Sequence, residues 1–278
     1  MSRIDARLSR LAEGGRKALV PFFTAGDPSP GATVAVMHAL VEAGADLIEL
    51  GVPFSDPMAD GPVIQRSSER ALGKGVGTGA VFDFVREFRR RDADTPVVLM
   101  GYLNPVEMRG AGAYAAAARE AGVDGLLLVD LPPEEAAPTR EAFNAAGLQL
   151  ISLAAPTTSP ERLARLASEA QGYLYYVSFA GVPGASITDA GEVGRRCAEL
   201  RALAEVPVLV GFGIKDAASA AAMAALADGV VVGSALVEAL AGAADDDEAA
   251  RRARDFLAPL RAALDGLNWP PHTARVAS

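Results

Sequence analysis

Short apolar segments, each followed by a longer stretch with helical periodicity, recur along the whole chain. In the helical stretches apolar residues return every three or four positions, which is the spacing of one helix face. Every connection is long enough for a crossover, so neighbouring strands are expected to run parallel. The pattern predicts strands at residues 18–23, 46–50, 96–100, 125–129, 148–153, 173–177, 207–210 and 229–232. It predicts helices at residues 31–43, 62–72, 80–91, 111–121, 133–146, 160–170, 192–204, 216–227 and 245–264.

The repeat predicts a fold class. Parallel strands are covered on both faces and read as nearly continuous apolar runs, as residues 126–129 and 230–232 do here. Eight such units in 278 residues predict an α/β protein with one (β/α)8 TIM barrel domain over residues 1–278. An extra N-terminal helix at residues 4–13 is expected to close the bottom of the barrel. An open doubly wound sheet is the alternative, but residues 22–28 lack the Gly-x-Gly-x-x-Gly sequence expected after its first strand.

Composition narrows the class of protein. The chain carries 26 basic and 35 acidic side chains, a formal net charge of −9, without a lysine-rich stripe, which argues against nucleic acid as a partner. Its apolar runs are far shorter than the roughly 20 residues of a membrane span. Residues 1–20 lack the unbroken apolar core of a signal peptide, so we expect a cytoplasmic protein with no membrane partner. The single cysteine, Cys197, excludes an internal disulfide, and no cluster with metal-ligand spacing is present.

Glu49 is the first candidate for chemistry. It lies one residue before the end of an otherwise apolar predicted strand. In a (β/α)8 barrel the active site lies at the C-terminal ends of the strands. If Glu49 points into the barrel, loss of hydration raises its pKa toward the range useful for proton transfer. A buried glutamate paired with a basic residue is the structural alternative, which is less favoured because no basic residue stands at a predicted strand end.

Asp60 is the second candidate, in the long segment 51–61 that follows the same strand. One interpretation is a cap for the helix that begins near Pro62. The other is a second carboxylate on a loop that folds over the barrel mouth and faces Glu49 across a substrate. The sequence leaves both open. Asp56 in the same loop stands next to Pro57 and is interpreted as fixing the loop.

Glycine-rich turns after the last two strands predict a phosphate site. Gly213 follows the seventh predicted strand, while Gly233 and Ser234 follow the eighth and open a short helical stretch. Glycines let the backbone approach an anion, and free N–H groups at a helix start hold it. Barrels of this class bind phosphate at these two loops. Gly184, after the sixth strand, is a further candidate donor.

Apolar and aromatic side chains near the predicted strand ends complete the candidate pocket. They are compatible with a flat apolar ligand, although most would belong to the core in any barrel. These residues are Phe22, Met100, Tyr102, Leu127, Tyr175 and Phe212.

Four segments together carry a family resemblance: residues 21–28, 49–62, 130–134 and 211–214. With them the chain resembles the alpha subunit of tryptophan synthase over nearly its whole length, and the segment 49–62 is the most specific. The resemblance implies a (β/α)8 barrel and a lyase that cleaves indole-3-glycerol phosphate to indole and glyceraldehyde 3-phosphate in tryptophan biosynthesis. It implies a beta-subunit partner in an α2β2 heterotetramer, with no cofactor in this chain and pyridoxal phosphate only in the partner.

The resemblance also implies roles for residues of this sequence. Glu49 and Asp60 match the catalytic carboxylates. The phosphate-binding positions are matched by Gly184, Gly213, Gly233 and Ser234, and the indole pocket by Phe22, Met100, Leu127, Tyr175 and Phe212.

Departures from the family pattern stand at three positions. Met100 replaces a frequent leucine and keeps its volume and apolar character. Phe179 stands where an arginine or another polar residue is usual, and Pro183 replaces a threonine and has neither its hydroxyl nor a backbone N–H.

Two other functions remain as hypotheses: a different sugar-phosphate barrel enzyme, and a non-catalytic barrel that binds phosphate and regulates a partner.

Overall fold

A closed barrel of eight parallel strands forms the centre of the molecule, in a computed structural model that describes residues 1–177, 190–211 and 213–267. The strands follow one another around the barrel in chain order, and β8 pairs back with β1. The predicted (β/α)8 fold class is confirmed. The strands are β1 (Ala18–Thr24), β2 (Ile48–Gly51), β3 (Val97–Gly101), β4 (Gly125–Leu128), β5 (Gln149–Ala154), β6 (Leu174–Tyr176), β7 (Val208–Val210) and β8 (Gly229–Val232).

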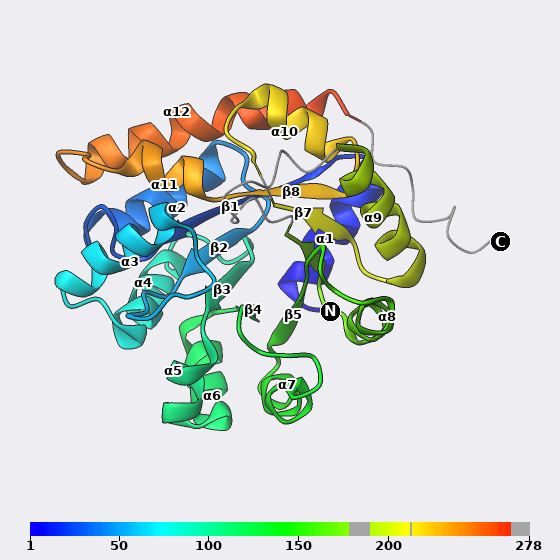
Figure 1. The fold of residues 1–278 in the computed structure, drawn as a ribbon. Helices are drawn as coiled ribbons and strands as arrows, with labels where there is room; N and C mark the ends of the chain where they lie inside the picture. The colour runs from blue at the N-terminus through cyan, green and yellow to red at the C-terminus, as the bar shows by residue number, and fades with distance from the viewer. Residues whose placement is uncertain (178–189, 212, 268–278) are drawn as a thin grey trace.

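Helices surround the barrel (Figure 1). Their apolar faces pack on the outward side chains of the strands, which buries both faces of the sheet. The helices are α1 (Arg3–Glu13), α2 (Ala32–Glu42), α3 (Pro62–Gly73), α4 (Thr78–Arg89), α5 (Leu103–Arg109), α6 (Ala111–Ala121), α7 (Ala136–Ala145), α8 (Pro160–Glu169), α9 (Ala190–Leu203), α10 (Ala217–Ala224), α11 (Ser234–Leu240) and α12 (Asp246–Asp265). In the described part of the chain no helix is long and apolar enough to cross a membrane.

The extra N-terminal helix is confirmed as α1, and it packs against the N-terminal end of the barrel. Its first turn is fixed by a capping box between Ser2 and Asp5. The Ser2 hydroxyl donates to the Gln149 side chain at the start of β5, over 2.9 Å. Ile4 is fully buried, and a Cβ at Gly125, at the start of β4, would lie 3.2 Å from Ile4 Cδ1. An apolar side chain of α1 therefore helps to close this end.

Buried side-chain acceptors tie strands together at the same end. Before each even-numbered strand stands an Asp or Gln whose side-chain oxygen accepts the backbone N–H of the first or second residue of the preceding odd-numbered strand. The pairs are Asp46 with Leu19, Asp124 with Val97, Gln171 with Leu150 and Asp228 with Val208, at 3.0, 2.9, 3.0 and 2.8 Å. These bonds span each βαβ unit, so we call them the N-terminal clamps.

Arginines from the surrounding helices neutralise the three aspartates of the N-terminal clamps. Arg261 pairs with Asp46 at 3.0 Å, Arg89 with Asp124 at 2.7 Å and Arg201 with Asp228 at 3.1 Å. Burying an aspartate is costly unless it is paired and hydrogen-bonded, and each of these is both. The clamps therefore fasten helices as well as strands to the N-terminal end.

Some element boundaries differ from the predicted ones. Strand β2 begins at Ile48 instead of residue 46, because Asp46 serves as a clamp. Helix α7 begins at Ala136 instead of residue 133; the preceding turn closes with the Glu135 N–H on the Pro132 carbonyl, at 3.0 Å. Helix α5, after β3, was not predicted.

Candidate active site

Glu49 lies inside the barrel on β2, where the sequence pattern predicted it. In the parallel register it stands beside Phe22 of β1 and Val98 of β3, and its side chain has no exposed surface. The Tyr173 hydroxyl donates a hydrogen bond to Glu49 Oε1. The other carboxyl oxygen, Oε2, is buried and has no hydrogen-bond partner in the described structure. The hydrogen-bond partner of Glu49 among the described residues is therefore Tyr173, which sequence reasoning missed.

Burial dominates the electrostatics of Glu49. The loss of hydration raises the pKa of its carboxyl from 4.5 to about 7, although the hydrogen bond from Tyr173 opposes this shift. Burial, together with the neighbouring Glu49 carboxylate, raises the pKa of Tyr173 well above its usual value, so the phenol stays protonated as a donor. Glu49 therefore exchanges its proton near neutral pH, as a general acid and base must.

The raised pKa of Glu49 predicts a pH-dependent stability. Below about pH 4.5 the carboxyl is protonated in both folded and unfolded chains, whereas above about pH 7 the folded chain carries a buried charge that the unfolded chain hydrates. Stability is therefore lost as the pH rises through this window. We expect Glu49→Gln to raise the free energy of unfolding by about 3 kcal/mol at pH 8.5 and by almost nothing at pH 4.

Urea titrations at the two pH values test this expectation. The exposed Glu69 of α3 provides the matched control, since Glu69→Gln removes a carboxylate that is already hydrated. An equal gain for Glu49→Gln at both pH values would contradict a stability effect of the buried charge.

Asp60 lies in the loop between β2 and α3 and does not cap the helix. The N-cap position of α3 is Gly61, and no side chain caps the helix start. The Asp60 carboxyl instead hydrogen-bonds with the hydroxyl of Tyr102, which also accepts the Ala59 N–H at 3.0 Å. Burial raises the pKa of Asp60 to about 6, and the Tyr102 hydrogen bond opposes the shift. The capping interpretation is therefore wrong.

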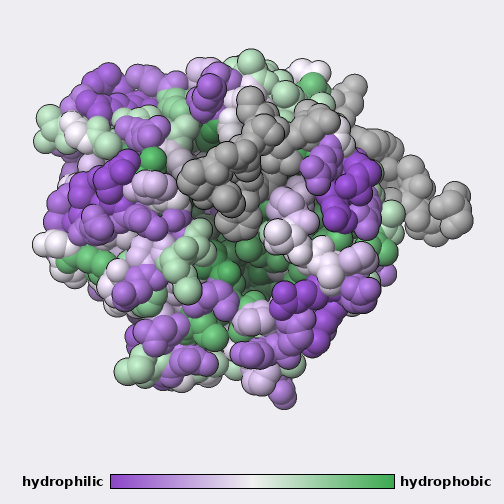
Figure 2. Space-filling model, viewed as in Figure 1, coloured by the Kyte–Doolittle hydropathy of each residue, from purple (hydrophilic) through white to green (hydrophobic). Residues whose placement is uncertain are grey.

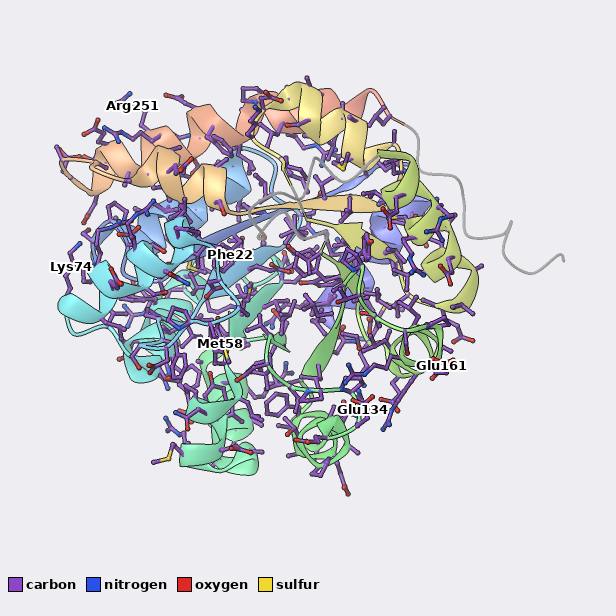
Figure 3. The ribbon with its side chains drawn as sticks, in the orientation of Figure 1. Phe22, Met58, Lys74, Glu134, Glu161 and Arg251 are labelled. Carbon is purple, nitrogen blue, oxygen red and sulfur yellow. The ribbon has the colours of Figure 1, made fainter. Side chains whose placement is uncertain are left out.

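Asp60 faces a small cavity at the C-terminal end of the barrel. The cavity is lined by Asp60, Phe22, Met100, Tyr102, Ile64 and Val129, among others. Figure 3 shows Phe22 near the middle of the molecule, while Met58 stands on the loop that carries Asp60. Hydrophobic side chains gather in the central hollow of this face, with hydrophilic ones around the outer helices (Figure 2). The carboxyl of Asp60 thus lies against apolar side chains at the mouth of the barrel.

Two other predicted pocket residues lie in the barrel wall but do not line this cavity. Leu127 is fully buried on β4, in register with Met100 of β3. Tyr175, on β6, follows Tyr173 by two residues and so shares its inward face. A Cβ at Gly211 would overlap the Tyr175 hydroxyl, so only glycine leaves room for this ring. Phe212 lies outside the described residues.

The predicted phosphate residues stand at the ends of β7 and β8. Gly213 has a φ of +62°, which favours glycine, and Ser234 is the first residue of α11. A Cβ at Gly233 would lie 3.2 Å from Phe22 Cδ1, so this turn packs directly on the pocket aromatic. Gly184 lies outside the described residues. No described contact tests phosphate binding, and the site stays a prediction.

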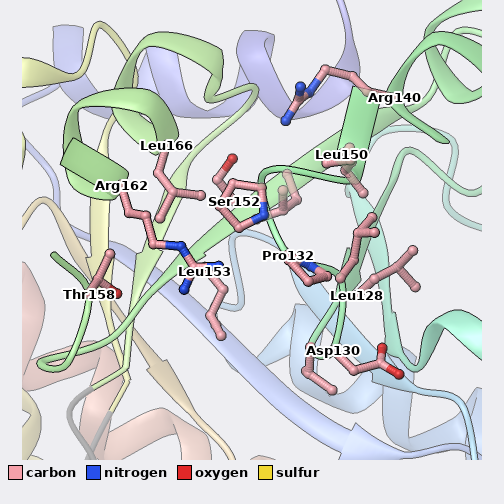
Figure 4. Close-up of a pocket in the computed structure, with 15 residues that line it drawn as sticks. Leu128, Asp130, Pro132, Arg140, Leu150, Ser152, Leu153, Thr158, Arg162 and Leu166 are labelled. Carbon is pink, nitrogen blue, oxygen red and sulfur yellow. The ribbon is translucent and has the colours of Figure 1, made fainter. Parts of the chain in front are cut away.

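A second hollow lies outside the barrel wall, between α7 and α8 (Figure 4). Its volume is about 270 Å³, and Arg140 and Arg162 lie on opposite sides of Ser152. Both arginines are already paired, Arg162 with Glu134 and Arg140 with Glu169. The hollow contains neither predicted catalytic carboxylate.

Within the described ranges, no group of three or more His, Cys, Asp or Glu side chains is placed to hold a metal ion. Cys197 is buried on α9, and burial raises its pKa to about 12, so it stays a thiol. The predicted carboxyl groups, Glu49 and Asp60, each lie beside a tyrosine hydroxyl, that of Tyr173 and that of Tyr102 respectively.

Comparison with known proteins gives consistent matches. The family model described as tryptophan synthase alpha chain matches residues 8–264. The tryptophan synthase alpha chain of Xanthomonas oryzae pv. oryzae is 68% identical over 266 residues, which cover 95% of this chain and 99% of the relative. That of Xylella fastidiosa is 66% identical over 267 residues, 96% of this chain and 100% of the relative. The crystal structure of tryptophan synthase subunit alpha from Legionella pneumophila superposes with a TM-score of 0.90 at 46% identity, covering 96% of this chain and 100% of that one.

Proposed function

The chain belongs to the tryptophan synthase alpha chain family, and from this premise we propose that Glu49 and Asp60 are its catalytic carboxylates. The chain is the carbon–carbon lyase that cleaves indole-3-glycerol phosphate to indole and glyceraldehyde 3-phosphate in tryptophan biosynthesis. One observation carries the assignment: burial raises the pKa of the Glu49 carboxyl inside the barrel to about 7, and one of its oxygens has no hydrogen-bond partner among the described residues.

Glu49 supplies the proton transfers of a retro-aldol cleavage. Its acid form gives a proton to the ring carbon that carries the glycerol chain, which leaves positive charge on the ring nitrogen. The resulting carboxylate then takes the proton of the adjacent glycerol hydroxyl. As the carbon–carbon bond breaks, its electron pair returns to the ring, and indole and the aldehyde are released. A pKa near 7 lets one group perform both transfers at neutral pH.

Asp60 stabilises the charge that develops between these transfers. Its carboxylate accepts the ring N–H as the nitrogen becomes positive, in a cavity where Phe22 and Met100 exclude water. Because the pKa of Asp60 is about 6, the group is mostly ionised at pH 7.5. The hydroxyl of Tyr102 orients it.

Substrate binding uses both sides of the barrel mouth in this proposal. Phe22, Met100, Leu127, Tyr175 and Phe212 form the apolar pocket for the indole ring. The phosphate is held at the ends of β7 and β8 and by the β6 loop, through Gly184, Gly213, Gly233 and Ser234. The close approach of Gly233 to Phe22 supports this proposal, because one residue proposed for phosphate and one proposed for the indole ring are neighbours.

An alpha chain implies a beta-chain partner. We propose that the assembly is an α2β2 heterotetramer in the cytoplasm, that this chain needs no cofactor of its own, and that pyridoxal phosphate is bound by the partner. The mass of the complex formed with a beta chain, measured by light scattering, tests the stoichiometry.

Asp60→Asn tests the proposed role of Asp60. Asparagine keeps the size but not the negative charge, so we expect kcat for indole release to fall by about 10²-fold or more. Activity is measured as indole released from indole-3-glycerol phosphate, with the exposed Asp83→Asn of α4 as the matched control. Unchanged activity in Asp60→Asn would remove Asp60 from the mechanism. A wild-type chain that releases no indole would favour the non-catalytic alternative.

A further inference from the structure

The side chain of Gln65, in the second turn of α3, reaches back to the loop that carries Asp60. Its amide nitrogen Nε2 lies 2.9 Å from the Asp60 carbonyl oxygen and 3.3 Å from the Pro57 carbonyl oxygen. Both neighbours are acceptors only, so the NH2 group and not the amide oxygen must face them. One side chain thereby bridges two carbonyls of the loop.

These two carbonyls mark the ends of a tight turn. The Asp60 N–H donates to the Pro57 carbonyl at 3.0 Å, which closes the turn from Pro57 to Asp60. The helix that follows begins with Gly61 and Pro62, and neither residue offers a side-chain cap that could fix the turn. Among the described contacts the turn is held to the rest of the protein by Gln65 on one side and by Tyr102, through Ala59, on the other.

Helix α3 is a firm support for Gln65. The Ser67 hydroxyl lies 2.6 Å from that of Thr24, and this buried contact ties the helix to the end of β1. Two turns from the helix start, Arg70 binds the buried carboxylate of Asp27 through two bonds of 2.7 and 2.8 Å. A bidentate pair of this kind fixes geometry as well as charge. Gln65 therefore connects the turn to a helix that is itself fixed to the barrel.

We propose that Gln65 is a positioning residue, which holds the Pro57–Asp60 turn so that the Asp60 carboxyl stays in the cavity beside Phe22 and Met100. Gln65 does not line that cavity, so it acts on the reaction only through Asp60. The inference rests on the proposed function of Asp60. Small displacements of a catalytic group lower the rate steeply, because the ordered geometry provides much of the rate enhancement.

Three substitutions of Gln65 distinguish the effect of its hydrogen-bond donor from the effect of its side-chain shape. Gln65→Leu removes the donor, and Gln65→Glu replaces it by oxygens that repel the two carbonyls. Gln65→Lys keeps a donor of sufficient reach. With the alpha chain assembled with its beta chain, we expect kcat for indole release to fall about tenfold in the first two variants, with KM within about twofold. Gln65→Lys should stay within about threefold of wild type, as should Arg66→Gln, an exposed neighbour on α3.

A double-mutant cycle with Asp60 decides how Gln65 acts. If it acts through Asp60, Gln65→Leu should not slow the Asp60→Asn variant further. Additive losses, or wild-type kcat in both Gln65→Leu and Gln65→Glu, would overturn the inference. Equal losses in Gln65→Lys and Gln65→Leu would also overturn it, since a lost donor would then not be the cause. If Asp60→Asn alone keeps full activity, the proposed function of Asp60 fails instead, so the two failures are distinguishable.

Discussion

Replacing Glu49 by glutamine is expected to lower kcat for indole release by about 10³-fold or more, because both proton transfers are assigned to this one carboxyl. Glutamine fits the same space and can still accept the hydrogen bond from Tyr173. It has no proton to give to the ring carbon and no basic oxygen to take one from the hydroxyl. The loss is therefore expected in kcat, while KM for indole-3-glycerol phosphate changes little.

Indole released under saturating substrate measures this effect. The exposed Glu120→Gln, near the C-terminal end of α6 and away from the candidate site, serves as the matched control. The gain in stability expected for Glu49→Gln at high pH shows in the same preparation that the variant is folded. Retained turnover in a folded Glu49→Gln chain would assign the acid and base chemistry to another group.

Replacing Asp124 by alanine is expected to lower the free energy of unfolding by about 3 kcal/mol. Asp124 is buried, accepts the Val97 N–H at 2.9 Å and pairs with Arg89 and Arg3 at 2.7 and 2.8 Å. Alanine leaves the largely buried guanidinium of Arg89 without its counter-charge and the start of β3 without its clamp. Arg3 is more exposed and regains water, so it contributes less to the loss.

Urea titration at neutral pH measures the loss for Asp124→Ala. Asp124→Asn keeps an oxygen for the Val97 N–H and removes the charge, so its smaller loss separates the clamp from the ion pairs. Asp94→Ala, at an exposed position in the loop before β3, provides the control. A loss below about 1 kcal/mol for Asp124→Ala would mean that the buried pair adds little to stability.

The position of Glu49 was predictable from the sequence because an acidic residue interrupts an apolar parallel strand near its C-terminal end. Its partner was not found, since Tyr173 opens a predicted strand whose aromatic residues all suit a core. A signal was available: Tyr173 and Tyr175 stand two residues apart and share a face, so both point inward if either does. A side-chain contact across the barrel, such as that between Glu49 of β2 and Tyr173 just before β6, leaves no trace in local periodicity.

The role of Asp60 could not be settled from the sequence, because an aspartate shortly before a proline-started helix also suits a cap. In the structure the N-cap position of α3 falls one residue later, on Gly61. The Asp60 carboxyl hydrogen-bonds with Tyr102 instead. Helix α5 was missed because the segment from Leu103 to Arg109 is short, and only Val106 in it is buried. A single buried position cannot produce the three-to-four-residue spacing of apolar residues that predicts a helix.

The N-terminal clamps lie at the end of the barrel opposite to the candidate site. The strand ties of the clamps and the ion pairs of their aspartates lie at one end, while the loops proposed to meet the substrate leave from the other. Substitutions in those loops can therefore alter selectivity without weakening the frame that supports them. This separation makes the barrel a tolerant starting point for directed evolution toward other indole derivatives, provided that the clamp residues are kept constant.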